Sequence, residues 1–210
     1  LHKWDIPIPE ARALQERLAA QVIETPPSDF HPRFVAGADM SHRRGSPYLY
    51  GAVIVWDRKT GQIVETSTAR ARATFPYVPG FLSFREGPVL LEAFRHLKQR
   101  PDAVLFDGQG RAHPRSFGLA CHLGCWIGLP SVGCAKTRFC GHHTEPGAKP
   151  GSTGPLTHEG RRIGTVLRTR RGSKPVFVSI GHRIDLPSAE ALVLGSLRGF
   201  RLPEPSRQAH

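Results

Sequence analysis

The chain has 210 residues and a formal net charge of +12, from 29 Lys and Arg against 17 Asp and Glu. This length predicts one domain, and a hydrophobic fraction of 39% is enough for a core, which excludes a wholly disordered chain. Because no apolar run approaches the ~20 residues of a membrane-spanning helix, and residues 1–5 hold no apolar signal segment, we expect a cytoplasmic protein with no membrane partner.

The first half of the chain predicts one helix and then strands. Leu14, Leu18 and Val22 recur every fourth residue, which predicts an amphipathic helix over residues 10–24. A Pro-rich stretch at 25–29 ends it. Three strands are predicted next, at residues 34–40, 49–56 and 62–68. The turn at 57–61 predicts that the last two strands form a hairpin.

The second half alternates helices with strands. Helices are predicted over 84–98, with Pro88 in the first turn, and over 114–128 and 188–197. Strands are predicted over 103–106, 131–135, 162–169 and 176–180. Residues 141–160 predict an irregular surface loop, and the tail from about residue 200 is expected to be frayed. No internal repeat or long linker divides the chain.

Early antiparallel strands followed by alternating helices and strands predict an α/β fold. The order matches a ribonuclease H-like domain, with a mixed central β-sheet flanked by helices, formed by residues 1–210 as one unit. The apolar strand 103–106 predicts a buried, parallel strand that places Asp107 at its carboxyl end. Ligands collect at the carboxyl ends of such strands.

The four cysteines predict reduced thiols rather than disulfides. Cys121, Cys125, Cys134 and Cys140 all lie within twenty residues of one another, which is not the spread of a disulfide framework. Cys121 and Cys125 stand four apart on a predicted helix and are interpreted as small core residues. A zinc site would combine Cys134 and Cys140 with the adjacent histidines 142 and 143, but the spacing fits no regular zinc finger. The role of these residues stays open.

Three carboxylates stand out by their placement. Asp39 ends an apolar strand, Glu86 opens a helix, and Asp107 follows the central strand. Oxygen ligands of this kind suit Mg²⁺, with Mn²⁺ as a substitute. Each acid taken alone is equally explained as a strand-end turn residue or as a helix N-terminal acid. Taken together on a basic chain, they indicate metal-dependent hydrolysis of phosphodiesters.

The positive charge has three possible explanations: a nucleic-acid surface, an anionic membrane surface, or an arginine bias without a partner. No long amphipathic basic helix is present, so membrane binding is the weakest of them. The arginines are spread along the chain, as in the pairs Arg43–Arg44 and Arg70–Arg72. Each can reach a phosphate, which favours nucleic acid as the partner.

Five segments, in order, resemble the endonuclease V family over most of the chain. They are VAGADMS (35–41), PYVPGFLSFREGP (76–88), DGQGRAHPR (107–115), GCAK (133–136) and GHRI (181–184). The resemblance implies an endonuclease that recognises inosine in DNA and cuts the second phosphodiester bond on its 3′ side. We expect a monomer, although the sequence does not determine the oligomeric state. The products would carry 3′-hydroxyl and 5′-phosphate ends.

The resemblance also implies roles for individual residues. Asp39, Glu86 and Asp107 take the metal-binding places, Lys136 faces the scissile bond, and His182 lies near the same centre. His113 contacts the flipped base or its strand. Purely structural roles remain possible for three of these residues. Lys136 could be a solvated strand-end lysine, His113 a loop residue and His182 a core imidazole.

The loop at 76–80 has a physical reason to contact a base. Two prolines restrict its backbone, so Tyr77 can be held as a wedge where a base leaves the stack. An ordinary proline turn over the core is the alternative. Glycines allow backbone groups to approach the base edge. The full set of expected substrate-binding residues is Pro76, Tyr77, Val78, Pro79, Gly80, Leu82, Gly108, Gly110, His113 and Gly118.

Two other functions stay open from the sequence. One is a nuclease that prefers inosine in RNA, and the other is a catalytically silent nucleic-acid-binding module. The presence of all three acids argues against the silent module. Phe139 stands where the family usually has an aliphatic residue, which predicts a narrower base pocket.

Overall fold

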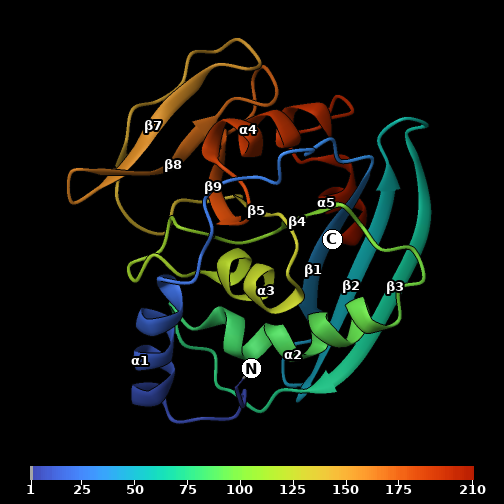
Figure 1. Ribbon diagram of the computed structural model, residues 1–210, viewed down its shortest axis with the longest axis vertical. Coiled ribbons are helices and arrows are strands. Elements are labelled where there is room, and N and C mark those ends of the chain that lie inside the picture. The colour runs from blue at the N-terminus through green and yellow to red at the C-terminus, as the bar shows by residue number, and fades with distance from the viewer. Residues whose placement is uncertain (1) are drawn as a thin grey trace.

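The computed structural model describes residues 2–210, in which nine strands form one mixed sheet in the order β3-β2-β1-β4-β5-β9-β8-β7-β6 (Figure 1). The strands are β1 (Phe34–His42), β2 (Tyr48–Asp57), β3 (Gln62–Arg72), β4 (Ala103–Phe106), β5 (Ser131–Ala135), β6 (His142–His143), β7 (Thr153–His158), β8 (Arg161–Leu167) and β9 (Val176–His182). The helices are α1 (Ile8–Ala19), α2 (Leu82–Arg95), α3 (Leu119–Ile127), α4 (Leu186–Gly195) and α5 (Glu204–Ala209).

The centre of the sheet is buried on both faces. Strands β1, β4 and β5 run parallel, and β2 pairs antiparallel with β1. Along β4 the side chains alternate: Val104 and Phe106 pack in the cluster beneath α2 and α3, whereas Ala103 and Leu105 pack in the cluster beneath α4. This two-sided burial explains the continuous apolar run of β4. The expected α/β architecture, a mixed central sheet flanked by helices, is confirmed.

The predicted hairpin is confirmed, with strands slightly longer than expected. Its turn closes at Gly61, whose φ of 72° lies in the left-handed region that glycine tolerates. Asp57 accepts a hydrogen bond from the Lys59 amide at 2.8 Å. Asp57 also pairs with Arg33 at 2.7 Å, which holds the pKa of its carboxyl at about 2. These contacts fix the end of the hairpin that is remote from Asp39.

The prediction of an irregular loop over 141–160 is wrong, because the segment contains β6 and β7. Strand β7 pairs with β8 and β6, and Leu156 is buried in a small cluster beside β8. The sequence gives no strand signal at Gly154 and Pro155, because both residues are poor strand formers. Proline is tolerated because the sheet is close to its edge there: β6 is only two residues long.

The prediction of a frayed C-terminal tail is also wrong. Helix α5 packs on β1, and its Pro205 and Ser206 are buried. A side chain at Gly37 of β1 would overlap the backbone carbonyl of Pro205, so this glycine permits the close approach. A helix of six residues has little intrinsic stability, so tertiary packing holds it. The packing carries the last residue, His210, to the carboxyl end of β1.

Other boundaries differ by a few residues. Helix α1 ends at Ala19, and α3 begins only at Leu119. Helix α2 begins at Leu82, so Pro88 lies inside it rather than in its first turn. The burial of Ser83 and Phe84 holds the additional residues before the proline in place.

The four cysteines are free thiols, as expected. Among residues 2–210, none of the helices combines the length and the apolar character required to cross a membrane.

Candidate active site

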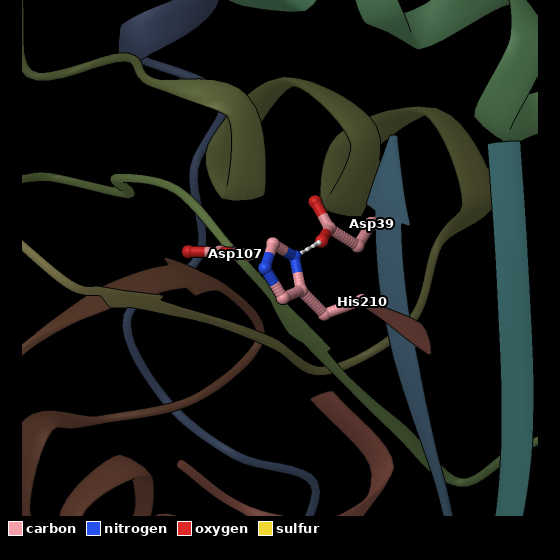
Figure 2. Close-up of side chains that lie close together, drawn as sticks. All are labelled: Asp39, Asp107 and His210. Atoms are coloured by element: carbon pink, nitrogen blue, oxygen red, sulfur yellow. Dashed lines mark hydrogen bonds and ion pairs between the residues drawn. The ribbon is translucent and has the colours of Figure 1, made fainter. Parts of the chain in front are cut away.

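The sheet topology brings two acids to one edge. Because β1 and β4 are parallel neighbours with Ala38 opposite Phe106, the residues that follow, Asp39 and Asp107, emerge together. One ligand atom each from Asp39, Asp107 and His210 lie within 4.8 Å of one another (Figure 2). The predicted meeting of the two aspartates at the carboxyl edge of the sheet is therefore found in the structure.

Glu86 is a buried residue of α2, and it responds to the charges of Asp39 and Asp107. Burial, and then the negative charges of Asp39 and Asp107, raise the pKa of Glu86 to about 8. Burial likewise raises the pKa of Asp39, with Asp107 adding to the effect. Like charges that raise one another's pKa are costly without a cation between them. The convergence of these carboxyls points to a cation site.

Lys136 lies directly after β5 and faces the acids, as expected. Its Nζ is 2.5 Å from an Asp107 carboxylate oxygen and 3.3 Å from His210 Nδ1. The ammonium thus lies on the side of the centre where β5 ends. It is placed to neutralise an anionic group bound at the acids.

His210 is the residue of the centre that sequence reasoning missed. Its Nδ1 is 2.6 Å from Asp39 Oδ2, and Figure 2 shows the ring lying between Asp39 and Asp107. No spacing signal marks it, because its position depends on how α5 packs on β1. Only the correct placement of α5 would have found it.

His182 does not join this centre, which corrects the expectation. Strand β9 is antiparallel to β5, so its last residue, His182, pairs with Ser131 at the start of β5. Lys136 follows the other end of β5. There His182 Nδ1 is 3.3 Å from both the Ile23 amide and the Cys125 thiol. Burial lowers the pKa of His182. It is a packed imidazole, the alternative that the sequence left open.

The donor set fits a hard divalent cation. Carboxylates of Asp39 and Asp107 lie side by side with an imidazole, and Glu86 is close enough to respond to their charges. Carboxylate oxygens are the preferred ligands of Mg²⁺ and Mn²⁺, and Mn²⁺ accepts an imidazole as well. The structure therefore groups two of the three expected metal ligands, Asp39 and Asp107, with His210 as an additional candidate, and Glu86 lies outside this group.

A cavity of about 430 Å³ opens beside the acids. Its volume lies within the range of small-molecule sites. Asp107 and Lys136 line its inner end, and Phe139 lines it as well. Eight of the ten predicted substrate-binding residues also line it: Tyr77, Val78, Pro79, Gly80, Leu82, Gly108, His113 and Gly118.

Two predicted binding residues do not line the cavity. Pro76 is exposed on the loop before it. Gly110 is buried, and its amide donates to Ser179 Oγ at 2.9 Å. A side chain at Gly110 would overlap the carbonyl of Ile180, so this glycine serves packing against β9. The glycine interpretation is thus wrong for Gly110.

The loop that forms the outer wall of the cavity is held at one carbonyl. Gly80, with φ of 85°, offers its carbonyl oxygen to three side chains. Gln15 Nε2 and His113 Nε2 donate at 3.0 Å, and Arg115 Nη2 donates at 2.6 Å. Arg115 Nε also donates to Gln15 Oε1 at 2.7 Å. We call Gln15, His113 and Arg115 the loop clamp.

The clamp changes the interpretation of His113. Its Nδ1 accepts from the Arg115 amide at 3.2 Å, so its Nε2 carries the proton donated to Gly80. Both ring nitrogens are therefore used within the protein, and His113 positions the loop instead of hydrogen bonding to a base. Gln15, on α1, was not singled out by any motif. Burial of a glutamine on an otherwise amphipathic helix is the signal that marks it.

We expect Gln15→Leu to loosen the loop clamp. The variant removes the hydrogen bond from Gln15 to the Gly80 carbonyl and the acceptor of Arg115 Nε. This loss costs about 1–3 kcal/mol of unfolding free energy. Amide hydrogen exchange at residues 77–81 should accelerate by about tenfold or more. Gln21→Leu, at an exposed position after the same helix, is the matched control. Unchanged exchange in Gln15→Leu would contradict the clamp.

His113 gives the stability a pH dependence. Burial, and then the charge of Arg115, lower the pKa of His113 from 6.5 to about 4. Between pH 6.5 and 4 the unfolded chain binds a proton that the folded chain does not, so this group's contribution falls as pH falls, by up to about 3 kcal/mol. Urea unfolding from pH 7 to pH 4 should show wild type losing more stability than His113→Gln. Parallel curves would contradict this, and exposed His31→Gln serves as the control.

Comparisons with known proteins agree on one family. A sequence model described as Endonuclease V matches residues 16–210. A protein named Endonuclease V from Myxococcus xanthus is 46% identical over 208 residues, which are 99% of this chain and 88% of that protein. The crystal structure of the endonuclease V from Streptomyces avermitilis has a TM-score of 0.92 and 42% identity, covering 98% of this chain and 91% of its own.

A second similar structure carries a nucleic acid. It is an endonuclease V from Ciona intestinalis, described as a complex with a 23mer DNA that contains an inosine followed by a ribo-adenosine. Its TM-score is 0.86 at 26% identity, and the match covers 96% of this chain and 93% of that one.

Proposed function

The chain belongs to the endonuclease V family, and from that premise we propose that Asp39, Glu86, Asp107 and His210 form the metal centre at which it cuts inosine-containing DNA in repair. One observation supports this assignment most strongly. Asp39, Asp107 and His210 converge, and Asp107 pairs with Lys136 at the wall of a cavity that the loop of Tyr77 to Gly80 also lines.

The acids and their neighbours have distinct tasks in this proposal. Asp39 and Asp107 hold a divalent cation, with Glu86 and His210 beside them. The bound cation polarises the phosphodiester and activates a water molecule. Lys136, 2.5 Å from Asp107, lies where it can pair with a phosphate oxygen as the bond breaks.

The cavity receives the base and the loop helps to extract it. Tyr77 lines the cavity with 70% of its surface exposed, so its ring is free to stack on a base. Pro79 and the loop clamp fix the backbone behind it. An ordered wedge lowers the cost of separating a base from its stack, which is a few kcal/mol. Backbone groups of Gly108 and Gly118 lie at the cavity wall, where they can meet the base edge.

The position of the cut is proposed as the second phosphodiester bond on the 3′ side of inosine. With the inosine base in the cavity, the following phosphates run toward the acids at its inner end. End-labelled duplexes with a single inosine, incubated with the purified protein and Mg²⁺, test this at nucleotide resolution. Matched strands of DNA and RNA in the same assay decide which sugar the enzyme prefers. A cut elsewhere, or no cut at any inosine, contradicts the assignment.

Removal of metal is expected to stop cleavage reversibly. Protein dialysed against EDTA should lose its nicking activity and regain it in Mg²⁺ or Mn²⁺, because the carboxyls alone cannot polarise the phosphate. Ca²⁺ should support binding without turnover, because it is larger and accepts looser geometry. Binding is measured by fluorescence anisotropy and turnover by gel. Cleavage that persists in excess EDTA would contradict a metal centre.

A further inference from the structure

The face of the sheet that holds Asp39 is exposed at the start of β2 and the end of β3, around Tyr48, Tyr50 and Arg70, whereas Ile54 and Trp56 further along β2 are buried. Helix α5 packs against β1, and Figure 1 shows β2 and β3 extending beyond it to the right. In the strand register Ser41 lies opposite Tyr50, and Tyr50 lies opposite Arg70. Directly opposed residues share a face, and alternate residues of one strand do too. Tyr50 and Arg70 therefore project from the same face as Asp39.

A second hollow, of about 460 Å³, lies on this face. Asp39, Ser41, Tyr50 and Arg70 line it, and Ala209 of α5 lines it as well. It lies on the Asp39 side of the metal centre, whereas the base cavity lies on the Asp107 side. The two hollows thus flank ligand atoms that are within 4.8 Å of one another.

The chemistry of this second hollow suits a nucleic-acid strand. Tyr48 and Tyr50 are exposed by 37% and 44%, and the Arg70 guanidinium lies 4.4 Å from the Tyr48 ring centroid. Within residues 2–210, neither Arg70 nor its neighbour Arg72 forms an ion pair. Exposed aromatic rings interleaved with free cations are the features that stack bases and pair with phosphates. We call Tyr48, Tyr50, Arg70 and Arg72 the hairpin platform.

We propose that the hairpin platform binds the nucleotides on the 3′ side of the cut, with Tyr50 stacking a base and Arg70 pairing with a phosphate. This rests on the proposed function, which places inosine in the first cavity and the scissile bond at the acids. A strand held in that way leaves the centre past Asp39. The surface it meets there is the platform, whose positive charge complements the phosphates.

The test uses single-stranded inosine oligonucleotides that differ only in the number of nucleotides beyond the cut, from one to eight. The measured quantity is the ratio of kcat/KM for the longest to that for the shortest substrate in Mg²⁺. Wild type should show a gain of about tenfold or more with length, the scale of one stacked base. Tyr50→Ala and Arg70→Ala should lose most of that gain, and Tyr50→Phe should retain it.

Matched controls separate the platform from general charge. Arg100 is exposed just before the amino end of β4, the opposite end of this strand from Asp107, so Arg100→Ala should keep the wild-type ratio. On the long substrate Arg70→Ala should also reduce the slope of log affinity against log salt by about 0.7, one phosphate contact on a single strand.

Two outcomes would overturn the proposal. One is a wild-type ratio retained in Tyr50→Ala and Arg70→Ala, and the other is an equal loss at every substrate length. Failure of the proposed function looks different, because then wild type itself cuts no inosine substrate. In that case the affinity of the same oligonucleotides in Ca²⁺ still tests the platform, and equal affinity of wild type and Tyr50→Ala overturns it.

Discussion

Asp107→Asn is expected to lower Mg²⁺-dependent cleavage of an inosine duplex by a factor of about 10³ or more. The substitution keeps the size of the side chain but removes the negative charge that holds a cation beside Asp39. It also removes the partner of Lys136, whose Nζ is 2.5 Å away. Asp39→Asn and Glu86→Gln should abolish cleavage for the same electrostatic reason. Single-turnover assays on end-labelled DNA measure the loss.

The fold should survive these substitutions. In the absence of metal, burial and then the negative charges of the neighbouring acids raise the pKa values of Asp39 and Glu86. Glu86→Gln therefore leaves the unfolding free energy unchanged or increases it, whereas Asp107→Asn also loses the ion pair with Lys136, a partly exposed pair worth about 1 kcal/mol or less. Binding of inosine DNA in Ca²⁺ should largely survive, because the cavity and the arginines supply it. An Asp107→Asn protein that nicks at the wild-type rate in Mg²⁺ would rule out the assignment of the metal ligands.

The second large effect is expected at Tyr77. Tyr77→Ala should weaken binding to inosine in duplex DNA by about 1–3 kcal/mol, the scale of one base–aromatic stack. The loss should be smaller on single-stranded DNA, where less unstacking is needed. Because the side chain is 70% exposed, its removal should not change the melting temperature. Affinity measured in Ca²⁺ on matched duplex and single-stranded oligonucleotides gives both values.

Tyr77→Phe is the matched control, since it keeps the ring and removes only the hydroxyl. It should bind both substrates like wild type if stacking is the contribution. Equal losses on duplex and single strand in Tyr77→Ala would make Tyr77 a general contact. No loss on either would return the loop to an ordinary proline turn.

The sequence predicted the central layout because its signals are local. The apolar run at 103–106 predicts a buried strand, and its parallel pairing with β1 brings Asp39 and Asp107 to one edge. Glu86 could be assigned only through the family resemblance, because its approach to the aspartates depends on how α2 packs on the sheet. Most of the cavity lining was found in the same way, through the PYVPG and DGQG segments.

The elements that the sequence missed depend on tertiary contacts. Strand β7 contains Gly154 and Pro155, whose intrinsic preferences oppose a strand until β8 supplies a partner. Helix α5 is stable only because Gly37 lets it approach β1. His210 and the uncovered hairpin platform both follow from that packing, so no local pattern could reveal them.

The structure removes His182 from the centre and gives His113, which still lines the cavity, a positioning role, for a related reason. A sequence motif identifies a histidine but does not show whether its ring faces a substrate or the protein core. His182 faces Cys125 because β9 runs antiparallel to β5, and His113 is engaged by Gly80 and Arg115. Strand direction and hydrogen-bond partners, which a single sequence does not specify, decide both cases.

Mn²⁺ binding tests the proposed metal centre, in which Asp39 and Asp107 hold the divalent cation with Glu86 and His210 beside them, without reference to activity. Free Mn²⁺ is followed by electron paramagnetic resonance while the metal-free protein is titrated. Wild type should show a saturable site that Asp107→Asn and Asp39→Asn remove and His210→Ala weakens. Glu145→Gln, at an exposed acid remote from the centre, should leave it intact. Equal Mn²⁺ affinity in wild type and Asp107→Asn would contradict the claim.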